Sequence, residues 1–191
     1  MAAARVIVGS AAAAAVAAAG LALASAGGDE APAELASVSR GCDQRVESRP
    51  IRVRAGRDTV IGPIAFYNLP AQFRPGAQRE GRVGVLNAPP MKALAIVRPG
   101  RTVTVTVPPD QRAWMRLFYD RSAYSGAEGS HSVTFGSCRR SASTQFAGEI
   151  SVDYAAAPDQ GRCARLEVSV RGTPGTIDGH PFDPTGARCG D

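Results

Sequence analysis

Residues 91–107 read MKALAIVRPGRTVTVTV, and this stretch decides the fold class of the chain. Threonine and valine alternate strictly over residues 102–107. This pattern predicts a strand whose valine face is buried and whose threonine face is exposed to solvent. Residues 91–97 predict a second strand. Between the two, Pro99 presets the first central position of a type II turn, and Gly100 supplies the positive φ that the second position requires. We therefore expect a β-hairpin over residues 91–107.

Strand signals recur on both sides of this hairpin, with turn signals between them. The expected strands span residues 50–54, 59–67, 114–119, 132–136, 144–154 and 163–170. Pro63, which follows Gly62, has no backbone N–H to donate a hydrogen bond to a neighbouring strand. The strand that contains it is therefore expected at a sheet edge or at a bulge. Residues 108–112 predict one helical turn that Asp110 can cap. Residues 173–188 show no reliable strand signal.

The regular recurrence of short strands predicts an all-β fold. No amphipathic helix of ten residues follows the N-terminal apolar leader. An antiparallel two-sheet sandwich of immunoglobulin-like layer plan, with seven to nine strands, buries one face of each strand. A closed β-barrel is the alternative, because both architectures share this strand pattern. Residues 42–191 are long enough for a single β-sandwich domain.

The N-terminus carries an export signal. Residues 6–24 form an uncharged apolar run after Arg5, and Ala24-Ser25-Ala26 has the small residues that a signal peptidase accepts. We expect residues 1–26 to be a signal peptide and residues 27–41 to be a flexible tether of a secreted or extracytoplasmic protein. An uncleaved membrane anchor over residues 6–24 is the alternative, since about 20 apolar residues span a bilayer.

The cysteines predict disulfides formed in an oxidising compartment. The chain has four of them, without a C-x-x-C pair: Cys42, Cys138, Cys163 and Cys189. If residues 132–170 form an up-down-up meander, Cys138 and Cys163 stand at opposite ends of it, beyond the ~7 Å limit for a bridge. Cys42 then pairs with Cys138 or with Cys163, and Cys189 takes the remaining cysteine.

The charge balance favours weak contact with anionic surfaces. The net charge is +5, and Lys92 is the only lysine. Arg52 and Arg54 share one face of the expected strand over residues 50–54, about 7 Å apart. They can contact anionic envelope polymer or lipid headgroups, or they can serve as an outer face that discourages edge-to-edge association. Nucleic acid is not expected, because aromatic and basic residues are not interleaved on any strand.

Catalytic motifs are missing from the sequence. The H-E-x-x-H, G-x-S-x-G and dinucleotide-binding patterns do not occur. Asp178, His180 and Asp183 are weak candidates for a cation site, with a solvated turn as the alternative. We expect a monomeric, non-catalytic binding or structural module of the cell envelope, without a cofactor. The alternative is a metal-dependent or hydrolytic enzyme that uses His131 together with these three residues.

Several short segments are similar to those of a known group of proteins. They are Gly62–Phe66, Leu117–Asp120, Val133–Phe135 with Cys138, Thr144–Gly148, Gly161–Cys163 with Leu166–Val168, and Arg188-Cys189. In these segments the chain resembles a group of uncharacterised exported actinobacterial proteins, and the similarity covers nearly all of residues 42–189. It implies export and a β fold, and it implies no catalytic activity. Two departures are Glu149, where glycine or an apolar residue is expected, and residues 173–184, which lack the alternation of a closing strand.

Overall fold

The structure is a computed structural model that describes residues 37–46, 49–69, 91–120, 128–153 and 164–182. All of these residues belong to one folded unit, Pro32–Asp191. The predicted leader, most of the predicted tether, and Cys163, Cys189 and Asp183 lie outside the described residues. In the part of the chain that is described, no helix is long and apolar enough to cross a membrane.

The described residues form twelve short strands and two 3₁₀ turns, so the all-β prediction is confirmed. The strands are β1 (Val38–Arg40), β2 (Thr59–Ile61), β3 (Ile64–Phe66), β4 (Met91–Lys92), β5 (Ala95–Val97), β6 (Thr102–Thr106), β7 (Met115–Phe118), β8 (Ser132–Gly136), β9 (Thr144–Phe146), β10 (Glu149–Val152), β11 (Ala164–Val170) and β12 (Thr176–Phe182), and the turns are η1 (Cys42–Gln44) and η2 (Pro109–Gln111). There are more than the seven to nine expected because three expected strands are interrupted and two strands were not expected: β12, and β1, which lies within the predicted tether.

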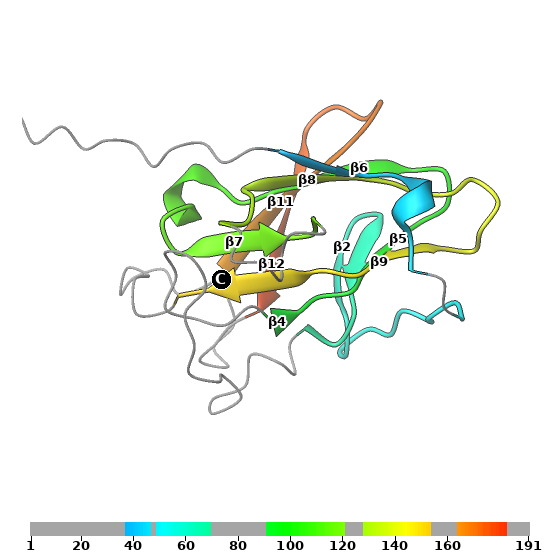
Figure 1. The fold of residues 1–191 in the computed structure, drawn as a ribbon, viewed down its shortest axis with the longest axis horizontal. Coiled ribbons are helices and arrows are strands. Elements are labelled where there is room, and N and C mark those ends of the chain that lie inside the picture. The colour runs from blue at the N-terminus through cyan, green and yellow to red at the C-terminus, as the bar shows by residue number, and fades with distance from the viewer. Residues whose placement is uncertain (1–36, 47–48, 70–90, 121–127, 154–163, 183–191) are drawn as a thin grey trace, which may run out of the picture. The chain divides into compact units, whose positions relative to one another are not determined.

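The strands pair into three sheets (Figure 1). Their strand orders are β1-β8-β6-β11-β12, β2-β3-β5-β9 and β4-β10-β7. Among the described residues none of these sheets closes on itself, so the barrel alternative is not the architecture found. Apart from the parallel pair of β1 and β8, the described ladders are antiparallel.

The five-stranded sheet is built around the alternating strand β6. Val103 and Val105 are fully buried in the core, as the alternation predicts. On the opposite face the hydroxyl oxygens of Thr104 and Thr134 lie 2.9 Å apart. The single turn predicted after this strand is η2, although its N-cap is Pro108 and not Asp110.

The predicted hairpin over residues 91–107 is wrong in its pairing. Strand β5 pairs with β3 and β9, whereas β6 pairs with β8 and β11. The Pro99-Gly100 turn does form, with φ 66° at Gly100, but it carries the chain from one sheet into another. All three residues of β5 are buried, so this strand needs cover on both faces and lies inside the four-stranded sheet. Turn residues determine the local backbone conformation, and they do not determine which strands pair with each other.

Residues 59–67 form a hairpin and not the single irregular strand that we expected. β2 and β3 pair around Gly62-Pro63, with Ile61 opposite Ile64. Gly62 has φ 57°, and proline holds φ near −65°. One positive φ at the first central position is typical of a type II′ turn, whose twist suits a two-residue hairpin. The missing proline N–H therefore falls in a turn, where no ladder bond is lost.

The expected strand over residues 144–154 is divided between two sheets, and the predicted meander is wrong. β9 pairs with β5, and after Ala147-Gly148 the chain continues as β10, which pairs with β4 and β7. At this break a Cβ on Gly148 would overlap the ring of Tyr119, so only glycine fits beneath this ring.

Two further expectations differ from the structure. Residues 50–54, expected as a strand, have no regular secondary structure, because no described strand pairs with them. Residues 176–182, for which no strand was expected, form β12 along β11. Its residues 176–178 are exposed, so backbone pairing alone defines the strand and apolar alternation is not required.

The core is one cluster to which all three sheets contribute. It includes Val105 from the five-stranded sheet, Phe66 from the four-stranded sheet and Ile150 from the three-stranded sheet. The rings of Phe135 and Tyr119 pack edge to face, with their centroids 4.9 Å apart. The Tyr119 hydroxyl donates a hydrogen bond to the carbonyl oxygen of Ala93, which satisfies the one polar atom that this ring brings into the core.

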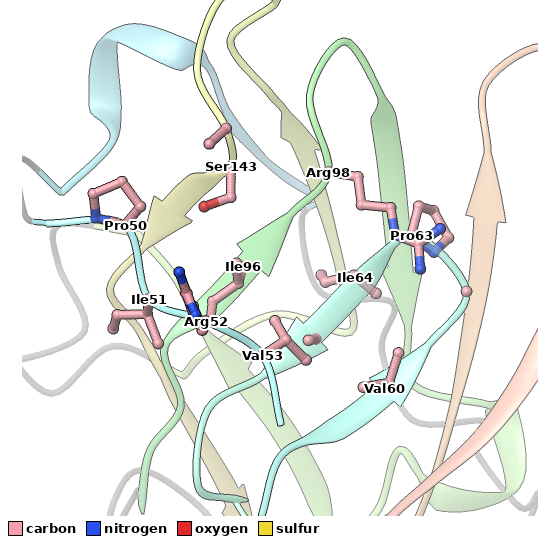
Figure 2. Close-up of a pocket in the computed structure, with 13 residues that line it drawn as sticks. Pro50, Ile51, Arg52, Val53, Val60, Pro63, Ile64, Ile96, Arg98 and Ser143 are labelled. Carbon is pink, nitrogen blue, oxygen red and sulfur yellow. The ribbon is translucent and has the colours of Figure 1, made fainter. Parts of the chain in front are cut away.

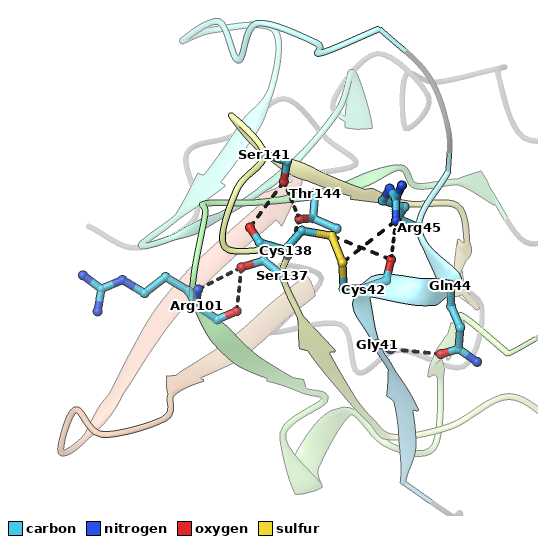
Figure 3. Close-up of a disulfide and its surroundings, with 9 residues drawn as sticks. All are labelled: Gly41, Cys42, Gln44, Arg45, Arg101, Ser137, Cys138, Ser141 and Thr144. Carbon is cyan, nitrogen blue, oxygen red and sulfur yellow. Dashed lines mark hydrogen bonds between the residues drawn. A yellow bond between two sulfur atoms is a disulfide. The ribbon is translucent and has the colours of Figure 1, made fainter.

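Strand β1 is attached to the five-stranded sheet by a disulfide. Because β1 and β8 are parallel, both end on the same side, and Cys42 and Cys138 follow these ends. The two cysteines are joined, with Cα atoms 5.1 Å apart (Figure 3). This pairing is one of the two that the sequence left open. Arg40 adds hydrogen bonds to the carbonyl oxygens of Tyr119 and Gln44.

We predict that Gly148→Ala lowers the free energy of unfolding by about 3 kcal/mol, because the added methyl group overlaps the Tyr119 ring. Gly136→Ala is the matched control. A Cβ at that position would meet its nearest neighbour at 3.8 Å, an ordinary contact. Urea denaturation of both variants measures the difference, and equal midpoints would contradict the assigned contact.

We predict that Cys42→Ala/Cys138→Ala lowers the free energy of unfolding by about 4 kcal/mol. The bond joins residues 96 apart, and opening so long a loop restores much conformational freedom to the unfolded chain. Denaturation of the variant and of the oxidised parent gives the difference. A loss below about 1 kcal/mol would show that the bridge does not constrain the unfolded state.

Candidate functional site

The four-stranded sheet is apolar on the face that turns away from the core. Val60, Ala65 and Ile96 are register partners on β2, β3 and β5, and Gln145 of β9 ends the row. Side chains alternate along a strand, so this row points away from the core residue Ile64 and its neighbours. Ala65 and Ile96 are nevertheless only 3% exposed, which means that they are covered.

Part of this cover is residues 50–53. In Figure 2, Ile51 and Val53 lie beside Ile96 and Val60 around a groove. The cover is incomplete, because Val53 and Val60 remain 43% and 48% exposed. The groove between the cover and the sheet has a volume of about 400 Å³, within the range of sites for small molecules.

The lining of the groove is aliphatic, with positive charge. Among the described residues that line it, Arg52 and Arg98 carry charge, and none has an acidic or aromatic side chain. The Ser143 hydroxyl is the remaining polar side-chain group. An apolar wall with a few polar groups is the usual composition of a ligand site.

A second hollow continues the groove. It has a volume of about 460 Å³ and shares Gly62, Pro63 and Arg98 with the groove. The second hollow adds Arg101 and Thr173 and is more polar than the groove. The combined surface therefore becomes more polar towards Arg101, and Arg52 adds a positive charge within the groove itself.

Arg98 and Arg101 are the first and fourth residues of the turn that joins the two sheets. In such a turn the Cα atoms of these positions lie less than about 7 Å apart. The Arg98 N–H donates to the Pro63 carbonyl oxygen at 3.0 Å, and the Arg101 N–H donates to Ser137 Oγ at 2.8 Å (Figure 3). Both backbones are thus fixed. Within the described residues, neither guanidinium forms an ion pair with a carboxylate.

The N-terminal end of the 50–53 segment is fastened to β9. The Val46 N–H donates to the Gln145 carbonyl oxygen at 2.8 Å, and Gln145 Nε2 donates to the Arg49 carbonyl oxygen at 3.1 Å. The disulfide at Cys42 fixes the chain just before these bonds. The position of the groove wall is therefore tied to the five-stranded sheet as well.

The C-terminal end of the same segment is held by the buried carboxylate of Asp58. It accepts hydrogen bonds from the backbone N–H groups of Arg54 and Asn68, at 2.7 and 2.9 Å, and pairs with Arg57 at 2.6 Å. Burial alone raises the pKa of Asp58, but these donors outweigh burial and hold the pKa below its ordinary value of 3.8. The Arg57 guanidinium also lies over the Tyr67 ring, 4.3 Å from its centre.

The two arginines singled out in the sequence have different positions. Both are exposed, but Arg52 lines the groove and Arg54 does not. They do not form a stripe on a strand, because residues 50–54 are not a strand. The Arg54 backbone instead closes the turn that Asp58 anchors.

The sequence candidates for metal or hydrolytic chemistry are not brought together in the described residues. His131 is buried immediately before β8, whereas Asp178 is exposed on β12. β6 and β11 lie between these strands, so about 14 Å separates their backbones at the usual strand spacing. His180 also stands on β12, and Asp183 lies outside the described residues. No group of three potential metal ligands occurs within the described ranges.

Trp114, Phe118 and Tyr119 are buried, with exposures of 2%, 1% and 1%. These three rings therefore offer no surface on which a sugar could stack.

Sequence reasoning missed the groove and the two turn arginines. Two signals pointed to them. Residues 93–97 are apolar at every position, which requires cover on both faces of a strand. Arg98 and Arg101 also flank a recognisable Pro-Gly turn, which places two cations close together. Neither signal identifies the segment that completes the groove.

Comparisons of the chain with protein-family models, with curated proteins and with solved structures find no match.

We predict that Asp58→Asn lowers the free energy of unfolding by about 2 kcal/mol between pH 5 and pH 7, because it weakens charge-assisted hydrogen bonds to a buried group. The pKa of Asp58 is lower in the folded than in the unfolded state. Its stabilising effect is therefore present above about pH 4 and is lost as the pH falls through the folded-state pKa. The difference between parent and variant should shrink below pH 4.

Urea denaturation at pH 7, 5 and 3 measures this dependence. Asp110→Asn is the control, since its exposed carboxylate makes a 3.3 Å contact with Arg165 and contributes at most about 0.5 kcal/mol. A difference for Asp58→Asn that stays constant down to pH 3 would contradict the lowered pKa.

Proposed function

We propose that the protein is an exported, non-catalytic binding module of the cell envelope, which takes an apolar ligand in the groove between residues 50–53 and the sheet of β2, β3, β5 and β9. It acts as a monomer. The observation that carries the proposal is the aliphatic groove of about 400 Å³ beside Val60, Ala65 and Ile96, because a concave and mostly apolar hollow of this size is the usual form of a ligand site.

The proposed architecture is an antiparallel two-sheet sandwich of immunoglobulin-like layer plan. The five-stranded sheet is one layer, and the four- and three-stranded sheets together make the other. In support, residues from all three sheets meet in one core cluster, among them Val105, Phe66 and Ile150. The groove then lies on the outside of the second layer, where a ligand can reach it without opening the core.

Export is supported by two independent features. Residues 6–26 have the composition of a signal peptide. The Cys42–Cys138 bridge is a type of bond that persists in oxidising compartments and is rare in the cytosol. By elimination, the proposed second bridge joins Cys163 to Cys189. The envelope location follows from these features and from the net positive charge, which favours anionic surfaces.

Binding of the neutral fluorescent dye N-phenyl-1-naphthylamine tests the groove. We expect saturable binding to the purified protein, and we expect Val53→Gln/Val60→Gln to weaken it at least tenfold. Both side chains are substantially exposed within the groove, so the substitutions remove apolar contact without disturbing the core.

Val46→Gln is the control, since Val46 is 36% exposed but does not line the groove. It should leave the dissociation constant unchanged. The proposal fails if the dye does not bind, or if the control weakens binding as much as the groove variant does.

A further inference from the structure

Positively charged side chains lie at one end of the groove. Its apolar part lies over Val60, Ala65 and Ile96, and it is continuous with the second hollow through Gly62, Pro63 and Arg98. A ligand that fills both hollows is apolar at one end and meets Arg98 and Arg101 at the other. This polarity is that of an amphiphile with a single chain.

The sign of the head group follows from the charges. Both hollows contain arginine, and their lining within the described part of the chain includes no acidic side chain. Arg98 and Arg101 have fixed backbones and lack an ion-pair partner among the described residues. A planar guanidinium fork matches the geometry of a carboxylate, and two such forks on one turn can share it.

The lining also selects the rest of the ligand. Aliphatic residues and proline form the apolar surface, and the described lining offers no aromatic ring that could stack on a base or a sugar. Ile51 and Val53 belong to this lining and lie beside Ile96 and Val60 (Figure 2). Such a surface suits an unbranched alkyl chain.

We propose that the groove binds a long-chain aliphatic carboxylate, with the alkyl chain between Val53 and the Val60–Ala65–Ile96 row and the carboxylate on Arg98 and Arg101. This inference rests on the proposed function, of which it names the ligand class. The ligand is a free carboxylate that enters as a monomer, and it is not a headgroup in a bilayer surface. Arg52, on the groove wall, stands away from the turn and does not hold the head group.

Displacement of N-phenyl-1-naphthylamine tests the proposal with four ligands, each below its critical micelle concentration: dodecanoate, dodecanol, dodecyl phosphate and dodecyltrimethylammonium. Dodecanoate should bind at least tenfold more tightly than dodecanol, and the cation more weakly than either. Because the attraction is electrostatic, the preference for dodecanoate over dodecanol should fall as salt is raised.

The decisive variant is Arg98→Ala/Arg101→Ala, which should lower the affinity for dodecanoate to that for dodecanol and leave dodecanol binding unchanged. Arg139→Ala/Arg140→Ala removes the same charge from an exposed turn outside both hollows and should change neither affinity. All of these positions are exposed, and circular dichroism checks that the variants fold.

Each contrary result has a distinct meaning. Equal affinities for dodecanoate and dodecanol overturn the carboxylate assignment but leave the proposed groove function standing, whereas no displacement by any ligand overturns both. Loss of the preference in Arg139→Ala/Arg140→Ala or in Arg52→Ala overturns the assigned head-group position. Dodecyl phosphate binding tenfold more tightly than dodecanoate, or binding to phosphatidylglycerol vesicles without binding of monomeric dodecanoate, overturns the ligand class.

Discussion

The need to cover both faces of β5 shapes much of this molecule. Ala95, Ile96 and Val97 are all buried, so apolar side chains leave the strand in both directions. One face enters the common core, where the three sheets meet. On the other face the described residues place no sheet, and the irregular segment 50–53 serves as a partial cover. Incomplete cover of an apolar face creates a concave aliphatic surface, and the groove is therefore a consequence of how this sheet is placed.

The groove wall owes its position to bonds of different chemistry at its two ends. Towards the N-terminus, a covalent bridge at Cys42 and hydrogen bonds to Gln145 fasten the chain to two sheets. Towards the C-terminus, the ionised Asp58 gathers the N–H groups of Arg54 and Asn68. Residues 50–53 can thus hold a defined position although they pair with no described strand. The floor is rigid because it is a sheet, and the arginines stand on a turn whose ends are both hydrogen-bonded.

Local properties of the sequence were predictable, and long-range choices were not. The alternation of Val103, Val105 and their threonines identified a strand and its buried face, because alternation is a local consequence of the pleat. The turn at Gly100 was also recognised. The partner of each strand was not, since pairing depends on which apolar faces remain uncovered once all strands are present. Residues 144–154 illustrate this limit, because β9 pairs with β5 whereas β10 pairs with β4 and β7, all of them distant in sequence. For the same reason Arg52 was found among the site residues, but the groove was not.

The parallel pairing of β1 with β8 has a consequence for the order in which the protein is assembled. Val38 lies opposite Val133, and Cys42 can form its disulfide only when Cys138 is also present. A chain that emerges N-terminus first, from a ribosome or through a translocation pore, therefore presents its first cysteine long before the partner arrives. Contacts so distant along the chain form slowly. Closure of this edge of the five-stranded sheet by the bridge therefore requires that the chain has been made at least as far as Cys138.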